Sequence, residues 1–170
     1  YPHELSGGMK QRVAIAMALL LNPKILIADE PTTSLDVMVQ SQIINLLKKL
    51  KKDRNMSIVF ISHDLGVISE VSETIAIMYR GQIVEFGKSH EIYKNPKHPY
   101  TEALLSAVPM ADPKIKKQRI ILQGEIPSPI NLPEGCRFSS RCSYRSSLCG
   151  EAEPEFKDLG GGHWVSCHRY

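Results

Sequence analysis

The chain has 170 residues, of which 42% are hydrophobic and 23% are charged, and its formal net charge is +3. This composition is typical of a globular protein with a buried core, and it excludes a disordered tail. So small a net charge gives no argument for nucleic-acid binding, and no apolar run approaches the roughly 18 residues that span a bilayer.

The composition changes near residue 90. Only three of the 11 prolines precede that point, whereas the others fall between Pro96 and Pro154, and all 4 cysteines lie between Cys136 and Cys167. We therefore expect two regions: an α/β part over residues 1–90 and an irregular, proline-rich extension over residues 91–170.

In the first region, the predicted elements alternate between helix and strand. Ser6-Gly7-Gly8 is expected to start a helix over about 9–21, and the apolar run 25–28 is typical of a strand buried on both faces. Asp36 is expected to cap a helix that ends near residue 52, and a second buried strand is predicted over 57–61. This order predicts a parallel sheet whose ligands lie beyond the carboxyl ends of its strands.

Further along, a short helix near 65–71 precedes a hairpin of two strands, 74–79 and 82–85, joined at Arg80-Gly81. In the extension, His98-Pro99 is expected to introduce a helix over 100–108. A strand is predicted over 120–123. Between them lies a basic patch that we expect to be solvated, formed by Lys114, Lys116, Lys117 and Arg119.

Residues suited to handling a phosphate follow the predicted turns and strands. A helix N-terminus at Ser6-Gly7-Gly8 can bind an anion, although this pattern is also common as a simple cap. Of the two adjacent carboxylates Asp29 and Glu30, one can hold Mg²⁺ through water and the other can polarise an attacking water. His63, after the second strand, can contact a transferring phosphoryl group.

In this order the segments resemble the ATPases of ABC transporters. Residues 5–12 resemble the signature motif LSGGQ, and residues 25–32 the Walker B strand with its glutamate. Residues 34–36 match the D-loop and residues 61–64 the switch-histidine loop. The segment His98-Pro99-Tyr100-Thr101 resembles the C-terminal extension of oligopeptide/dipeptide importer ATPases, and the methionine at position 9 is typical of that subgroup.

The resemblance implies an α/β fold, the C-terminal part of a P-loop NTPase domain with a parallel sheet, followed by the cysteine-containing extension. It also implies roles in ATP hydrolysis. Asp29 would support Mg²⁺, Glu30 would act as general base or position water, and His63 would sense the γ-phosphate. Asp36 would communicate between two ATPase subunits.

The signature segment is implied to serve a neighbouring molecule. Its residues Ser6, Gly7, Gly8 and Met9 would bind the γ-phosphate of a nucleotide held mainly by a second ATPase subunit, identical or sister. Permease subunits in the membrane and, indirectly, a peptide-binding protein are the other implied partners, with no nucleic acid. The implied location is peripheral, on the cytoplasmic face of the cell membrane.

The phosphate loop G-x-x-x-x-G-K-[ST] occurs nowhere in the chain, and the chain begins at Tyr1 rather than Met. We therefore expect a fragment of a longer ATPase that binds ATP weakly or not at all by itself. One alternative is an inactive remnant whose incomplete sheet exposes apolar surface. Another is a chromosome-associated ATPase of the same superfamily, although no heptad run is present.

The four cysteines form a candidate metal centre with the spacing C-x5-C-x6-C-x17-C: Cys136, Cys142, Cys149 and Cys167. Four thiolates can hold Zn²⁺ or an iron–sulfur cluster, and the spacing does not choose between them. The alternative is four free thiols. The family resemblance favours a four-iron, four-sulfur cluster over zinc.

Charged residues surround the cysteines in the sequence. Arg137, Arg141 and Arg145 are expected to offset the negative charge of a thiolate-ligated centre. His163 and His168 flank Cys167 and are possible substitute ligands, but we expect both to lie at the surface.

Overall fold

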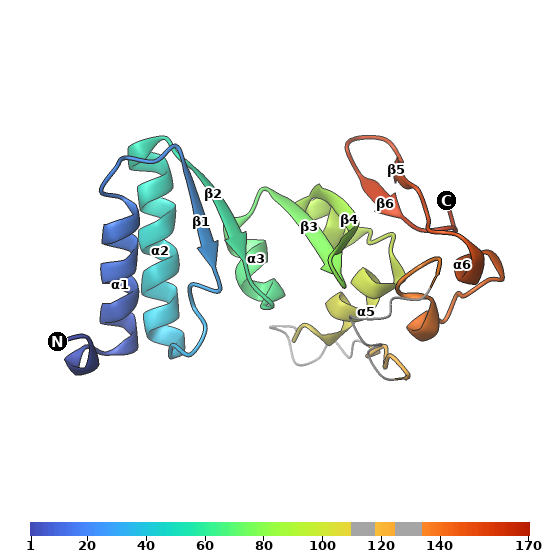
Figure 1. Cartoon of the computed structure of the whole chain (residues 1–170), viewed down its shortest axis with the longest axis horizontal. Helices are drawn as coiled ribbons and strands as arrows, with labels where there is room; N and C mark the ends of the chain where they lie inside the picture. Colours follow the sequence, from blue (N-terminus) through green and yellow to red (C-terminus); the bar gives the residue numbers. More distant parts are fainter. Residues whose placement is uncertain (110–117, 125–133) are drawn as a thin grey trace. The chain divides into compact units, whose positions relative to one another are not determined.

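The computed structural model describes residues 1–109, 118–124 and 134–170. The chain divides into two compact units, Tyr1–Val71 and Ser72–Tyr170 (Figure 1). The hairpin near residue 80 thus groups with the extension. The boundary near residue 90, which composition predicts between the α/β part and the extension, stays a prediction.

The first unit alternates helix and strand as expected. After a short 3-10 helix, η1 (Pro2–Glu4), come α1 (Gly7–Ala18), β1 (Ile25–Asp29), α2 (Val37–Arg54), β2 (Ser57–Ile61) and α3 (Leu65–Val71). The strands β1 and β2 pair in parallel, with Ile25 opposite Ser57 and Asp29 opposite Ile61. The predicted parallel pairing is therefore confirmed.

Local signals in the sequence set the limits of α2. The Asp36 side chain accepts a hydrogen bond from the backbone N–H of Val39 at 2.9 Å, which is the predicted N-cap. At the other end Asn55 adopts a left-handed conformation with φ 47° and ψ 47°, which ends the helix. Basic residues occupy the last turn, where they complement the helix dipole.

The core of the first unit lies on one face of the two-stranded sheet. Leu26 and Ala28 of β1 pack with Ile15 of α1 and with Ile43 and Leu47 of α2. The helices α1 and α2 lie side by side (Figure 1). One layer of helices therefore covers one side of the sheet.

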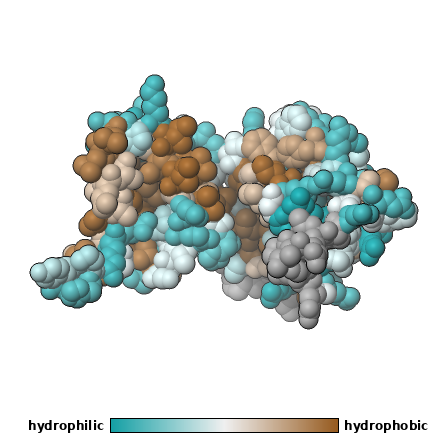
Figure 2. Space-filling model, viewed as in Figure 1, coloured by the Kyte–Doolittle hydropathy of each residue, from teal (hydrophilic) through white to brown (hydrophobic). Residues whose placement is uncertain are grey.

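The opposite face of this sheet corrects the expectation that β1 is buried on both faces. Ile25 and Ile27 are 62% and 67% exposed, and Val59 and Ile61 of β2 are 49% and 45% exposed. No described residue of the first unit packs a core against this face, so the apolar run is only half-buried. Figure 2 shows apolar surface over this unit. This agrees with the predicted exposure of apolar surface by an incomplete sheet.

The second unit is built on an antiparallel sheet in the order β3-β4-β6-β5. Its elements are β3 (Thr74–Tyr79), β4 (Gln82–Lys88), α4 (Ser89–Lys94), α5 (Pro99–Ala107), η2 (Ser139–Arg141), α6 (Leu148–Glu151), β5 (Phe156–Asp158) and β6 (Trp164–Ser166). The predicted β3–β4 hairpin is confirmed. Its turn residues Arg80 and Gly81 have φ of 49° and 78°, as a two-residue hairpin turn requires.

The one strand predicted in the extension, over residues 120–123, is wrong. The described residues 118–123 form no strand; instead the backbone N–H of Ile120 donates to the hydroxyl of Ser106 at 2.9 Å, which fixes this segment to α5. Conversely, β5 and β6 were not predicted, because three-residue strands are too short to show alternation. Of the basic patch, Arg119 is exposed, and the three lysines lie outside the described residues.

The core of the second unit is aromatic. Phe138 is 1% exposed and meets Tyr79 and His98 with ring centroids 5.2 and 5.5 Å apart. Tyr100 adds a further edge contact to Tyr79 at 4.8 Å. In the described ranges, no helix has the length and apolar character needed to cross a membrane.

Candidate functional sites

The signature segment forms the start of α1. The hydroxyl of Ser6 accepts a hydrogen bond from the backbone N–H of Met9 at 3.3 Å and so caps the helix. Gly7 and Gly8 lie against the start of α2: a Cβ at Gly8 would come 2.5 Å from Val39 Cγ1, and one at Gly7 would come 3.1 Å from a Leu35 methyl. Close packing within this unit therefore favours glycine at both positions, in addition to the predicted approach to a phosphate.

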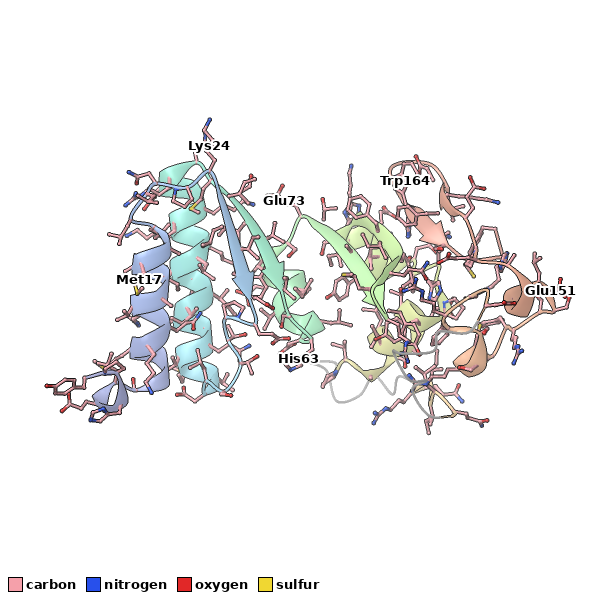
Figure 3. The ribbon with its side chains drawn as sticks, in the orientation of Figure 1. Met17, Lys24, His63, Glu73, Glu151 and Trp164 are labelled. Carbon is pink, nitrogen blue, oxygen red and sulfur yellow. The ribbon has the colours of Figure 1, made fainter. Side chains whose placement is uncertain are left out.

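The carboxyl ends of β1 and β2 bring Glu30 and His63 together. The backbone N–H of Glu30 donates to Ile61 O at 3.0 Å, which extends the pairing of the strands by one residue beyond Asp29. The Nδ1 atom of His63 lies 2.9 Å from Glu30 Oε1. His63 is labelled in Figure 3, at the end of β2. The sequence predicted that both residues follow strands, and the parallel register makes them partners.

A third residue, Thr33, holds the other oxygen of the Glu30 carboxylate. Its hydroxyl donates to Glu30 Oε2 at 2.5 Å. The sequence analysis missed Thr33, although its place three residues after Glu30 in a tight turn was a usable signal. Glu30 itself has φ of 47°, a left-handed conformation that is uncommon for residues other than glycine.

These contacts shift both ionisation equilibria. The hydrogen bonds from Thr33 and then from His63 lower the pKa of Glu30 below its usual 4.5. The pKa of His63 shifts in the opposite direction, because the hydrogen bond to Glu30 raises it above 6.5. The His63 side chain is 77% exposed and that of Glu30 is 36% exposed, so water screens the pair and reaches it freely.

The other predicted nucleotide residues stand apart from this pair. Asp36 is engaged as the cap of α2. Within the described part of the chain, no hydrogen bond joins Ser6 or Met9 to Glu30 or His63. The role of the signature at another nucleotide stays a prediction.

In the second unit, the four cysteines line one cavity of about 130 Å³, together with His98, Phe138, Tyr144, Ser146, His168 and Arg169 among others. The four cysteines were expected in separate loops of the sequence, and the fold brings them to one cavity. Burial raises the pKa of the thiols of Cys136, Cys142 and Cys167.

Each of the four sulfurs faces a backbone N–H group. Three sulfurs accept from the residue two positions later: Cys136 from Phe138, Cys142 from Tyr144, and Cys167 from Arg169. The sulfur of Cys149 lies 3.5 Å from the backbone N of Ser146. Among the described side chains, however, no group of three or more His, Cys, Asp or Glu is arranged to hold a single metal ion.

The arginines near the cysteines correct one expectation. Arg137 donates to the backbone carbonyl of Arg80 at 2.7 Å and faces Glu153 at 4.0 Å, while Arg145 is exposed. The described residues that line the cavity include Arg169 but none of Arg137, Arg141 and Arg145. Proximity in sequence was misleading for Arg137, which is held at the hairpin turn, whereas the expectation for Arg141 and Arg145 stays a prediction.

The two histidines beside Cys167 also differ from expectation. His163 is 7% exposed, not at the surface, and its Nε2 lies 2.7 Å from Glu85 Oε1. His168 lines the cysteine cavity and its Nε2 is 2.9 Å from Ala152 O. His163 is therefore committed to Glu85 and is not a substitute ligand.

Glu85 is the centre of a buried polar cluster that sequence analysis missed. Its carboxyl group is fully buried and accepts from the backbone N–H groups of Lys97 and His98 at 2.7 and 2.9 Å, in addition to the contact with His163. His98 in turn accepts from the N–H of Tyr100 at 3.1 Å as the cap of α5. Burial lowers the pKa of His98 to about 4, so its ring is neutral near pH 7.

Known protein families match two parts of the chain. Residues 1–33 match the family described as ABC transporter. Residues 84–149 match the family described as oligopeptide/dipeptide transporter, C-terminal region.

Individual relatives match along the whole chain. An oligopeptide transport ATP-binding protein, AppF, of Bacillus subtilis is 49% identical over 172 residues, which cover 100% of this chain and 52% of the relative. The dipeptide transport ATP-binding protein DppF of Escherichia coli is 48% identical over 167 residues, with 98% and 50% covered. The chain thus spans about half the length of these relatives.

A solved structure matches the fold. The protein cbiO1 of Clostridium perfringens, part of the ABC transporter complex cbiONQ, is 36% identical with a TM-score of 0.52. The match covers 55% of this chain and 38% of that chain.

Proposed function

We propose that this chain is the C-terminal part of an ATP-binding protein of an oligopeptide or dipeptide ABC transporter, and that the whole protein hydrolyses ATP to drive peptide import. The observation that carries the proposal is the pairing of Glu30 with His63 at 2.9 Å, at the carboxyl ends of two parallel strands. Ligands of α/β sheets lie at such ends.

In the proposed mechanism, each residue acts where the fold places it. Asp29, the last residue of β1, would hold the Mg²⁺ that arrives with ATP. Glu30, ionised because its pKa is lowered, accepts a hydrogen bond from the attacking water and orients it. His63 is exposed beside Glu30 and contacts the γ-phosphate. The hydroxyl of Thr33 holds the Glu30 carboxylate in place.

The signature residues act on a second molecule in this proposal. Ser6, Gly7, Gly8 and Met9 would complete the nucleotide site of a second ATPase subunit, and Asp36 would lie near that interface. Permease subunits would receive the resulting motion, with the protein peripheral to the cytoplasmic face of the membrane. The unpartnered face of β1 and β2 supports the further proposal that the preceding half of the protein covers this sheet.

The decisive experiment measures ATP hydrolysis by the full-length protein with its partner subunit. Glu30→Gln should lower kcat by about 10²–10⁴-fold while ATP binding is retained. Glu70→Gln is the matched control, because Glu70 is an exposed carboxylate of the same unit that pairs with Lys48. Equal activity of both variants and the natural protein would refute the role of Glu30. Tight binding of ATP by the 170-residue chain alone would refute the need for a preceding phosphate loop.

We also propose that the four cysteines hold an iron–sulfur cluster with a structural role. The support is that their sulfurs line one cavity, and that each has a backbone N–H donor, which favours the thiolate form. Zinc is the weaker candidate, because it needs all four sulfurs within about 2.3 Å of one point and no described group is so arranged.

The cluster proposal is tested by its metal content. The chain is purified without oxygen, and iron, acid-labile sulfide and zinc are quantified in it and in a Cys149→Ser variant. Iron and sulfide in equal amounts in the natural chain, reduced in the variant, would support the cluster. Stoichiometric zinc without sulfide would replace it with a zinc site, and the absence of all three would leave four free thiols.

A further inference from the structure

We propose that Arg169 supplies the positive charge that offsets the negative charge of a four-thiolate centre in the cysteine cavity. The proposal rests on the proposed cluster and assigns it a residue that the sequence did not suggest. Arg169 lines the cavity, and its backbone N–H donates to the sulfur of Cys167.

Two contacts fix this guanidinium. Its Nη1 donates to Glu102 Oε1 of α5 at 3.3 Å. Its central carbon lies 4.0 Å from the centre of the Tyr144 ring, a cation–π contact. The Arg169 side chain is 35% exposed. A cation held between a carboxylate and an aromatic ring keeps a defined place, and partial burial strengthens its field at the cavity.

Glu102 occupies only part of the hydrogen-bonding capacity of Arg169. A guanidinium has five N–H donors, and Glu102 takes one of them. Arg137, which directly follows Cys136, instead binds the hairpin turn at Arg80, and neither Arg141 nor Arg145 lines the cavity. Among the described residues, Arg169 is thus the guanidinium that lines the cavity.

This placement has a measurable electrostatic consequence. Reduction of a thiolate-ligated cluster adds one negative charge, and a nearby cation stabilises the reduced form. Removing the cation should therefore lower the reduction potential. We expect a change of about tenfold in the reduction equilibrium, which for one electron is about 59 mV.

The experiment compares four proteins, all as the full 170-residue chain purified without oxygen: the natural chain, Arg169→Gln, Arg169→Lys and Arg145→Gln. The visible spectrum reports cluster content, circular dichroism reports folding, and a redox titration gives the potential. Arg145→Gln is the matched control, because it removes one positive charge from the same region outside the cavity lining. Arg169→Gln should lower the potential, Arg169→Lys should restore much of it, and Arg145→Gln should change it little.

Each outcome decides the proposal. An unchanged potential in Arg169→Gln, or a shift no larger than that of Arg145→Gln, overturns it while the cluster itself stands. If Arg169→Gln loses the cluster, retention by Arg169→Lys supports the role of the charge, and equal loss in both variants overturns it. A natural chain without a cluster overturns this inference together with the cluster.

Discussion

The two units of the chain differ in how far their polar residues are exposed to solvent. In the first unit, Glu30 and His63 stand in water at the end of a sheet with one uncovered face. In the second unit, Glu85, His98 and His163 are buried and satisfied by hydrogen bonds within the unit. The exposed groups of the first unit are accessible to solvent, whereas the buried groups of the second unit join segments that are distant in sequence.

The comparison predicts that the largest single loss of stability comes from the buried cluster. Glu85→Ala leaves two backbone N–H groups and His163 without their acceptor, and should cost about 3–5 kcal/mol of unfolding free energy. Urea denaturation followed by the fluorescence of Trp164, the only tryptophan, measures it.

Glu91→Ala is the control for this prediction, because Glu91 is 45% exposed and pairs only at the surface with His90. It should change stability by no more than about 0.5 kcal/mol. Similar small losses for both variants would contradict a structural role for the Glu85 cluster.

The two faces of β1 give the second prediction. Leu26 is 8% exposed and Ile27 is 67% exposed, although they are neighbours in one strand. Leu26→Ala should destabilise the first unit by about 2–4 kcal/mol, and Ile27→Ala by about 0.5 kcal/mol or less. Hydrogen exchange of the amides of residues 1–71 measures both. Equal losses would show that the outer face is covered in this chain.

The third prediction concerns the glycines of the signature. Gly8→Ala should destabilise the first unit by about 1–3 kcal/mol, because the added Cβ would lie 2.5 Å from Val39 Cγ1. Gly7→Ala should cost less, since its contact would be 3.1 Å. Thermal unfolding by circular dichroism measures the change. Adding Val39→Ala to Gly8→Ala should recover part of the loss, and no recovery would speak against a steric cause.

The smallest predicted effect is a pKa shift in the exposed pair of Glu30 and His63. His63 should titrate above 6.5 by NMR, and Glu30→Gln should return it toward that value. Asp64→Asn should have a weaker effect, because Asp64 is the least of the causes that raise this pKa. An unshifted His63 in the natural chain would refute the contact in solution.

The sign of its pH dependence follows from the two shifts. The contribution of His63 to the stability of the folded state is fully present below about pH 6.5, and it is lost as the pH rises through its raised pKa. The contribution of Glu30 is present above about pH 4.5 and is lost as the pH falls through its lowered pKa. The pair is therefore strongest between these two values.

Several elements before residue 90 could be predicted from local sequence signals. The cap at Asp36, the strand over residues 57–61 and the hairpin at Arg80-Gly81 are set by neighbouring residues, and all are confirmed. The family resemblance, read from motifs, is confirmed by the matches to the ABC transporter family and the peptide transporter region. Strand burial was overestimated, because an apolar run does not reveal whether a layer of chain covers each face.

The amino-acid sequence by itself determined the identities and order of the chemical groups: the carboxylates after β1, the histidine after β2 and the four cysteines. Only the tertiary structure decided which groups meet. Parallel register joins Glu30 to His63, and loop packing gathers the four sulfurs beside Arg169. Burial commits His163 to Glu85 across 78 positions of sequence. The physical reason is that contacts between distant residues depend on how surfaces pack, and no local pattern encodes that.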